Sequence, residues 1–180
     1  MFGIFFKKKI TEDKLVEYFV FSTVKMVDEA FPDVAEIICA DPEFKYKPTV
    51  DSENSDPFLW IVITGNLRFI PRFFNDYQDI RLLDDANRRF ARMLDVPIDL
   101  FKEEVKKYDS LFSKLNHPSK NTVYAMSKAV FHKYDLGQFQ DEYFKNMDAP
   151  NPVFLKRLNE VMEGFIFEWE QVIEDYKIIE

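Results

Sequence analysis

Apolar residues recur at intervals of three and four along nearly the whole sequence, from Thr11 to Tyr176. This spacing places them on one face of an α-helix, where they can turn toward a core. The clearest example covers residues 98–115, where an apolar or aromatic side chain returns at every third or fourth position. The sequence therefore predicts an all-α fold, a single-domain helical bundle of about seven helices without a convincing sheet.

Proline, glycine and polar residues separate the expected helices. We expect a tail over residues 1–10, then one helical domain over residues 11–180 with a long polar loop at about 41–56. A Phe-Pro-Asp break at residues 31–33 should divide the first helical stretch into two helices. The expected helices cover about residues 12–30, 34–40, 57–70, 77–94, 98–115, 121–134, 138–147 and 152–176.

Residues 57–70 are compatible with two structures. Gly65-Asn66 is a recognised two-residue hairpin turn, and apolar runs flank it. However, the apolar residues here step by four, four and three, and an Asp-Pro pair at the start is typical of a helix N-terminus. Pro71 would kink or end such a helix at about residue 70. We expect a helix, with a short irregular or hairpin segment as the alternative.

The chain is acidic, with 32 aspartates and glutamates, 24 lysines and arginines and a formal net charge of −8. Nucleic acids and anionic membranes bind surfaces rich in lysine and arginine, so we expect neither as a partner. An acidic surface favours a basic protein, which long-range attraction would steer toward it. No apolar run approaches the roughly 18 residues of a membrane span, and no signal peptide is evident, so we expect a cytoplasmic protein.

Residue types that carry common catalytic or metal chemistry are sparse. A metal site in a helical bundle needs Glu-x-x-His, but His117 and His132 follow Lys114 and Ala129 at that spacing. Cys39 is the single cysteine, and its apolar surroundings favour a small buried side chain. The four glycines are scattered and form no phosphate-binding loop. We assign no catalytic residue, no metal ligand and no cofactor.

Arginine is unevenly distributed, because six of the seven arginines fall within residues 68–92. Several are spaced by four, which places them on a shared helix face. A guanidinium group can hold a carboxylate or phosphate with two hydrogen bonds. If their helices converge, these residues would form an anion site composed of Arg68, Arg72, Arg81, Arg88 and Arg92. The alternative is neutralisation by the interleaved acids Asp76, Asp79, Asp84, Asp85 and Asp95.

Twenty phenylalanines and eight tyrosines exceed what a core of this size needs, so we expect some aromatic rings at the surface. Phe73-Phe74 and Tyr143-Phe144 are candidates, each directing one ring to the core and one to another face. The leading hypothesis is a non-enzymatic binding module with an acidic surface that engages a basic protein. The alternatives are a small-molecule carrier or sensor that binds an anion through the arginines, and an enzyme of unknown type.

Overall fold

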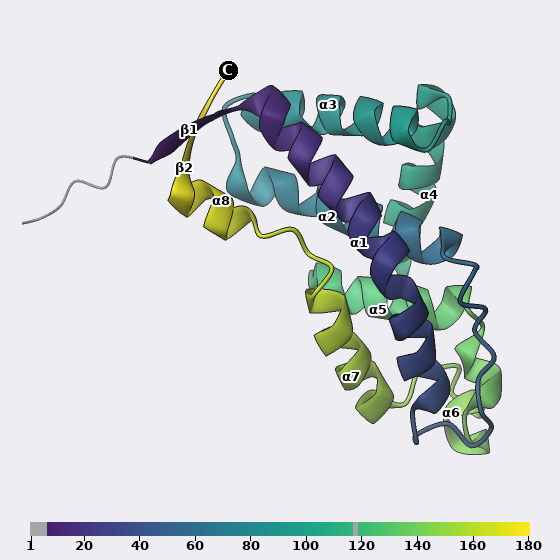
Figure 1. The fold of residues 1–180 in the computed structure, drawn as a ribbon. Coiled ribbons are helices and arrows are strands. Elements are labelled where there is room, and N and C mark those ends of the chain that lie inside the picture. Colours follow the sequence, from purple (N-terminus) through teal and green to yellow (C-terminus); the bar gives the residue numbers. More distant parts are fainter. Residues whose placement is uncertain (1–6, 117–118) are drawn as a thin grey trace, which may run out of the picture.

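The computed structural model describes residues 7–116 and 119–180, and within them the all-α prediction is confirmed (Figure 1). Eight α-helices, one 3₁₀ helix and two short strands form in this part of the chain. In order, they are β1 (Lys8–Thr11), α1 (Glu12–Ala40), α2 (Asp56–Phe73), α3 (Gln78–Met93), α4 (Ile98–Leu115), α5 (Thr122–Lys133), η1 (Leu136–Phe139), α6 (Glu142–Asn146), α7 (Pro152–Glu163), α8 (Trp169–Asp175) and β2 (Tyr176–Ile179).

Helix α1 continues through the proline that was expected to divide it. Thr11 immediately precedes the helix, and its side chain accepts a hydrogen bond from the Lys14 amide and so caps the helix. Pro32 removes one hydrogen bond to the carbonyl four residues earlier, on Asp28. Both residues are exposed, so that carbonyl can bond water instead. The prediction of two helices here is wrong because the proline lies on the solvent face of a packed helix.

Helix α2 occupies the segment that could have been a hairpin, and it lies at the centre of the fold. It packs against α1, α3, α4 and α5. Gly65 and Asn66 are buried inside this helix rather than in a turn. A Cβ atom at Gly65 would overlap the side chain of Met126, so the glycine allows α2 and α5 to approach closely. Pro71 falls in the last turn, close to the predicted end.

The long helix predicted over residues 152–176 is two helices, α7 and α8, joined by residues 164–168. Asn66 of α2 is fully buried and holds this connection through hydrogen bonds. Its side-chain amide donates to the Phe165 carbonyl, and its side-chain oxygen accepts from the Phe167 amide, both at 2.8 Å. Backbone groups of the connection thus bond to the core instead of continuing a helix.

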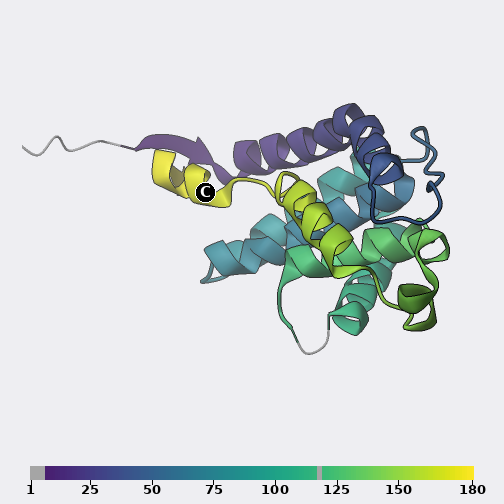
Figure 2. The same cartoon turned by 90° about the horizontal axis from the view of Figure 1, so that it is seen from below.

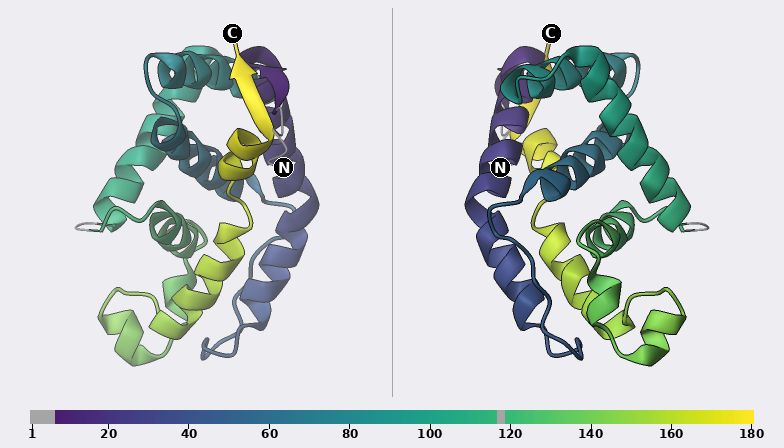
Figure 3. Two further views of the ribbon diagram at one scale, coloured as in Figure 1. Left: turned by 90° about the vertical axis from the view of Figure 1, so that its left-hand side faces the viewer. Right: turned by 90° about the vertical axis from the view of Figure 1, so that its right-hand side faces the viewer.

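The strands β1 and β2 form a two-stranded parallel sheet, with Lys8 opposite Tyr176 and Thr11 opposite Ile179. The end of the expected N-terminal tail is therefore paired with the last described segment of the chain. Figure 2 shows β1 and α8 at one end of the helical body, and Figure 3 shows β2 beside the start of α1. Within the described residues, no helix is both long and apolar enough to cross a membrane.

Candidate functional site

The structure brings together two of the five arginines predicted to form an anion site. Arg68 and Arg72 both line a groove between α2, α4 and α5. Arg68 is neutralised there, because its Nε donates to the carboxylate of Asp109 at 2.5 Å and its Nη2 donates to the Asp109 carbonyl at 2.8 Å. Arg72 donates instead to the hydroxyl of Thr122. These two arginines thus share a face, as their spacing predicted.

The other three predicted arginines do not line that groove. Arg81 donates from Nε and Nη2 to the two carboxylate oxygens of Glu12, at 3.0 and 2.7 Å. These hydrogen bonds hold the pKa of the Glu12 carboxyl below its usual value. Arg88 pairs with Asp84 one turn earlier on α3. Arg92 is exposed and forms no salt bridge with the described residues.

Groups suited to catalysis remain scattered. Cys39 is half-buried, contrary to the expected buried side chain, and His132 is exposed at the end of α5. His117 lies outside the described residues. Burial raises the pKa of Tyr108 to about 12, so this phenol stays protonated at neutral pH. Among residues 7–116 and 119–180, no group of three or more His, Cys, Asp or Glu side chains is placed to hold a metal ion.

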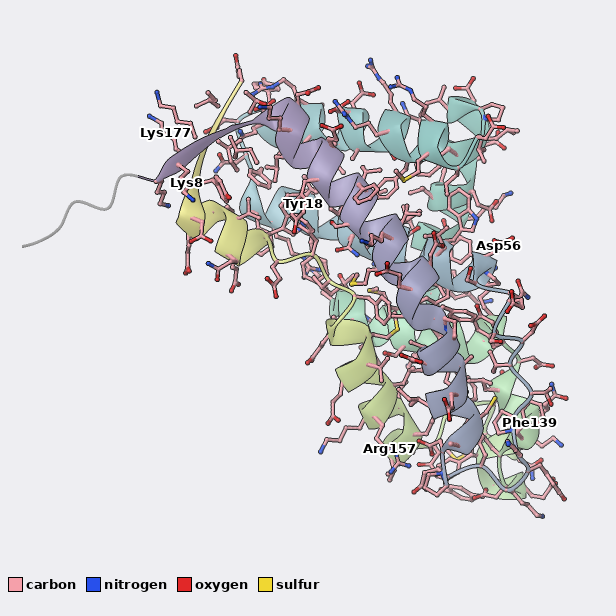
Figure 4. The ribbon with its side chains drawn as sticks, in the orientation of Figure 1. Lys8, Tyr18, Asp56, Phe139, Arg157 and Lys177 are labelled. Carbon is pink, nitrogen blue, oxygen red and sulfur yellow. The ribbon has the colours of Figure 1, made fainter. Side chains whose placement is uncertain are left out.

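A cleft of about 470 Å³ opens between α1 and α8, and we call it the α1–α8 cleft. Its walls come from β1, the first half of α1, the connection over residues 164–168, α8 and the start of β2. Tyr18, labelled in Figure 4, lines the cleft from α1 and is 58% exposed. Phe167 lines it from the connection between α7 and α8, and Val172 lines it from α8. This volume lies within the range of ligand-binding pockets in proteins.

Aromatic contacts fix the shape of the cleft wall. The Tyr18 ring meets Phe167 edge to face, with 5.7 Å between the ring centres. Phe167 in turn contacts Phe19 at 5.1 Å and Trp169 at 4.6 Å. Phe19 and Trp169 are buried in the core, so a packed cluster supports the partly exposed rings. The cleft therefore exposes aromatic side chains that are held in place by buried Phe19 and Trp169.

A second hollow of about 440 Å³ adjoins the cleft and shares Phe167 and Glu168 with it. We call it the acidic hollow, because four exposed glutamates line it, namely Glu163, Glu168, Glu170 and Glu174. None of the four forms a salt bridge with a residue that the structure describes. Residues 160–180 as a whole contain seven acidic side chains and one lysine. The four carboxylates make the hollow itself locally negative, whereas Lys7, Lys8 and Lys9 lie at the neighbouring β1–β2 pairing.

Sequence reasoning did not locate the cleft, because α1 and the α7–α8 connection meet only in the folded chain. Two local signals were nevertheless present. Tyr18 falls beside the buried stripe of its helix rather than on it, and the acidic run near the end of the sequence is almost free of lysine. Of the expected surface aromatics, Phe73 is half-buried and lines the acidic hollow, and Tyr143 is 67% exposed.

No family model matches this chain, and neither a curated protein nor a solved structure matches it. Function must therefore be inferred from the chemistry of the surfaces described above.

Proposed function

We propose that this protein is a non-enzymatic binding module whose α1–α8 cleft receives a basic segment of a partner protein. One observation supports the proposal above all. The aromatic wall of the cleft adjoins the acidic hollow, whose four carboxylates have no salt-bridge partner among the described residues. Apolar contact supplies most of the free energy of such an association, whereas charge selects the partner and speeds its approach.

The cleft suits a segment in which lysine or arginine alternates with apolar side chains. An apolar side chain of the partner would pack between Tyr18 and Val172 inside the cleft. A neighbouring cation would lie over an aromatic ring or beside Glu168 at the boundary with the acidic hollow. Tyrosine is well suited to such an interface, since it offers a large contact area with few rotatable bonds.

The net charge of the chain supports the same choice of partner. A protein with a formal charge of −8 attracts basic partners at long range, and salt screens that attraction. We therefore expect association rates and affinity to fall steeply as the salt concentration rises. An affinity that is indifferent to salt would contradict this proposal.

The test uses a fluorescein-labelled synthetic peptide of alternating lysine and leucine, with a glutamate–leucine peptide of equal length for comparison. Fluorescence anisotropy should show binding of the basic peptide only. Replacing Tyr18 by alanine, or Glu168, Glu170 and Glu174 together by glutamine, should weaken binding by about tenfold, which corresponds to about 1.4 kcal/mol. All four side chains are exposed, so the variants should fold normally.

A matched control removes three acidic charges elsewhere. Asp28, Asp33 and Glu36 are exposed on the second half of α1 and form no salt bridge with described residues. The triple variant Asp28→Asn, Asp33→Asn, Glu36→Gln changes the net charge by the same amount. If it weakens peptide binding as much as the triple variant of Glu168, Glu170 and Glu174 does, net charge alone is responsible and the cleft is not the binding site.

A further inference from the structure

A groove of about 460 Å³ lies between α2, α4 and α5, away from the α1–α8 cleft and the acidic hollow. Its lining is basic and rich in hydroxyl groups, although the protein as a whole is acidic. The side chains that carry the argument are Arg68, Arg72, Ser113, Ser119, Lys120 and Thr122. They come from three helices and from the residues that precede α5.

Arg72 is the central cation of this groove. Of the seven arginines, five form salt bridges with carboxylates of the described chain, and only Arg72 and Arg92 do not. The Arg72 guanidinium is nevertheless held in place. It lies 4.5 Å from the centre of the Phe69 ring and donates from Nη2 to Thr122 Oγ1. A positioned arginine without a carboxylate partner keeps donors available for an anion.

The neighbouring groups add charge and donors to the same groove. Lys120 is exposed, and its ammonium group forms no hydrogen bond or salt bridge with the described residues. The hydroxyl of Ser119 accepts a hydrogen bond from the Asn121 amide and donates to none of the described residues. The Thr122 hydroxyl likewise accepts from Arg72 and donates to no residue that the structure describes. Each of these hydroxyls therefore has a proton that no described residue accepts, and the groove lies at the positive end of helix α5.

Arg68 positions the two helices that border the groove and adds little net charge to it. Its bonds to Asp109 and Ser113 fix α4 against α2 on one side of the groove. Because the Arg68–Asp109 pair is neutral overall, Arg72 and Lys120 leave the groove with a net positive charge. This local charge opposes the negative field of the rest of the molecule.

We propose that this groove binds the phosphate group of a small phosphate monoester. A phosphate dianion has three terminal oxygens, which can accept bonds from the guanidinium, the ammonium and the two hydroxyl groups together. A carboxylate has two oxygens in one plane and would leave donors of this set unused. The volume of the groove leaves room for a small organic group attached to the phosphate.

The test is a titration of the full chain with phenyl phosphate, followed by amide and arginine side-chain NMR. Inorganic phosphate and benzoate serve as comparison ligands at equal ionic strength. Phenyl phosphate should shift the signals of Ser119, Lys120 and the Arg72 Nε–H group, and should bind more tightly than either comparison ligand. If inorganic phosphate binds equally well, or if benzoate does, the assignment to a phosphate monoester is overturned.

The variants are chosen to separate the groove from net charge. Arg72→Gln should weaken phenyl phosphate binding by about tenfold, because it removes a charge-assisted pair of hydrogen bonds. Lys120→Gln should weaken it by about threefold, and this exposed side chain has no hydrogen bond or salt bridge with described residues to lose. Arg92→Gln is the matched control, since Arg92 is the other arginine without a carboxylate partner among described residues.

Two results would overturn the proposal. The first is equal weakening by Arg92→Gln and Arg72→Gln, which would indicate a general charge effect. The second is unchanged binding in Lys120→Gln together with NMR shifts that lie outside the groove. Binding of the basic peptide in the α1–α8 cleft is measured separately, so failure of one proposal leaves the other standing.

Discussion

Replacing Asn66 should unfold the protein more easily and release the connection between α7 and α8. The Asn66 side chain is fully buried and makes two tertiary hydrogen bonds of 2.8 Å, one to the Phe165 carbonyl and one from the Phe167 amide. In Asn66→Leu the side chain keeps its branching at Cγ and leaves no cavity, but both backbone groups lose their partner. The substitution thus isolates the hydrogen bonds from the effect of a cavity.

The magnitude follows from the cost of leaving buried polar groups unpaired. Each such group costs about 1–3 kcal/mol, so the loss of both partners in Asn66→Leu should lower the free energy of unfolding by about 2–6 kcal/mol. Asn66→Ala adds a cavity and should cost at least as much. Thr64→Val is the matched control on the same helix, because the Thr64 hydroxyl is buried without a partner among described residues. Its removal should be neutral or stabilising.

Urea unfolding followed by tryptophan fluorescence measures these differences, since buried Trp169 lies next to the connection. Hydrogen exchange should also show faster exchange of the Phe167 amide in Asn66→Leu than in the wild type. If Asn66→Leu lies within about 0.5 kcal/mol of the wild type while Thr64→Val behaves as expected, then the hydrogen bonds do not hold the connection and this reasoning is wrong.

Two further predictions concern packing and charge. Gly65→Ala should destabilise the chain by about 1–2 kcal/mol in urea unfolding, because its methyl group would overlap Met126, and the same change in a Met126→Ala background should cost less. Glu12→Gln should lose about 0.5–1 kcal/mol at neutral pH. Arg81 lowers the pKa of Glu12 in the folded state. The stabilisation is therefore present above the pKa of Glu12 in the unfolded chain and disappears as the pH falls through the lower folded-state pKa. At that low pH the wild type and Glu12→Gln should become equally stable.

The sequence predicts a helix correctly where the stripe of apolar residues begins and ends at the same residues as the helix itself. Residues 98–115 were predicted as one helix, and α4 covers the same range. The break after α7 was missed because the spacing of buried residues continues across it. Phe165 and Trp169 remain buried although the chain between them is not helical. The cause of the break is a contact with Asn66, which lies 99 residues before Phe165, and such a contact leaves no periodic signal.

The arginines also show that a local sequence pattern does not reveal long-range contacts. The shared face of Arg68 and Arg72 follows from helical spacing alone, and both line one groove. The acidic partners of the other arginines follow only partly from proximity in sequence. Asp84 and Asp85 were expected partners, whereas Glu12 reaches Arg81 from another helix. Local pattern thus predicts which side chains lie on one face, but tertiary packing decides which of them keep an available charge.

The parallel pairing of β1 with β2 determines when the cleft can exist. Lys7, just before β1, donates to the Ile173 carbonyl 166 residues later, so this junction joins segments that leave the ribosome far apart in time. Closing so long a loop costs more entropy than forming local contacts, so we expect this pairing to form late in folding. A nascent chain can thus bury α2 and its neighbours while the wall formed by α8 is still missing. The partner binding that we propose for this cleft would therefore require a chain whose synthesis has passed β2.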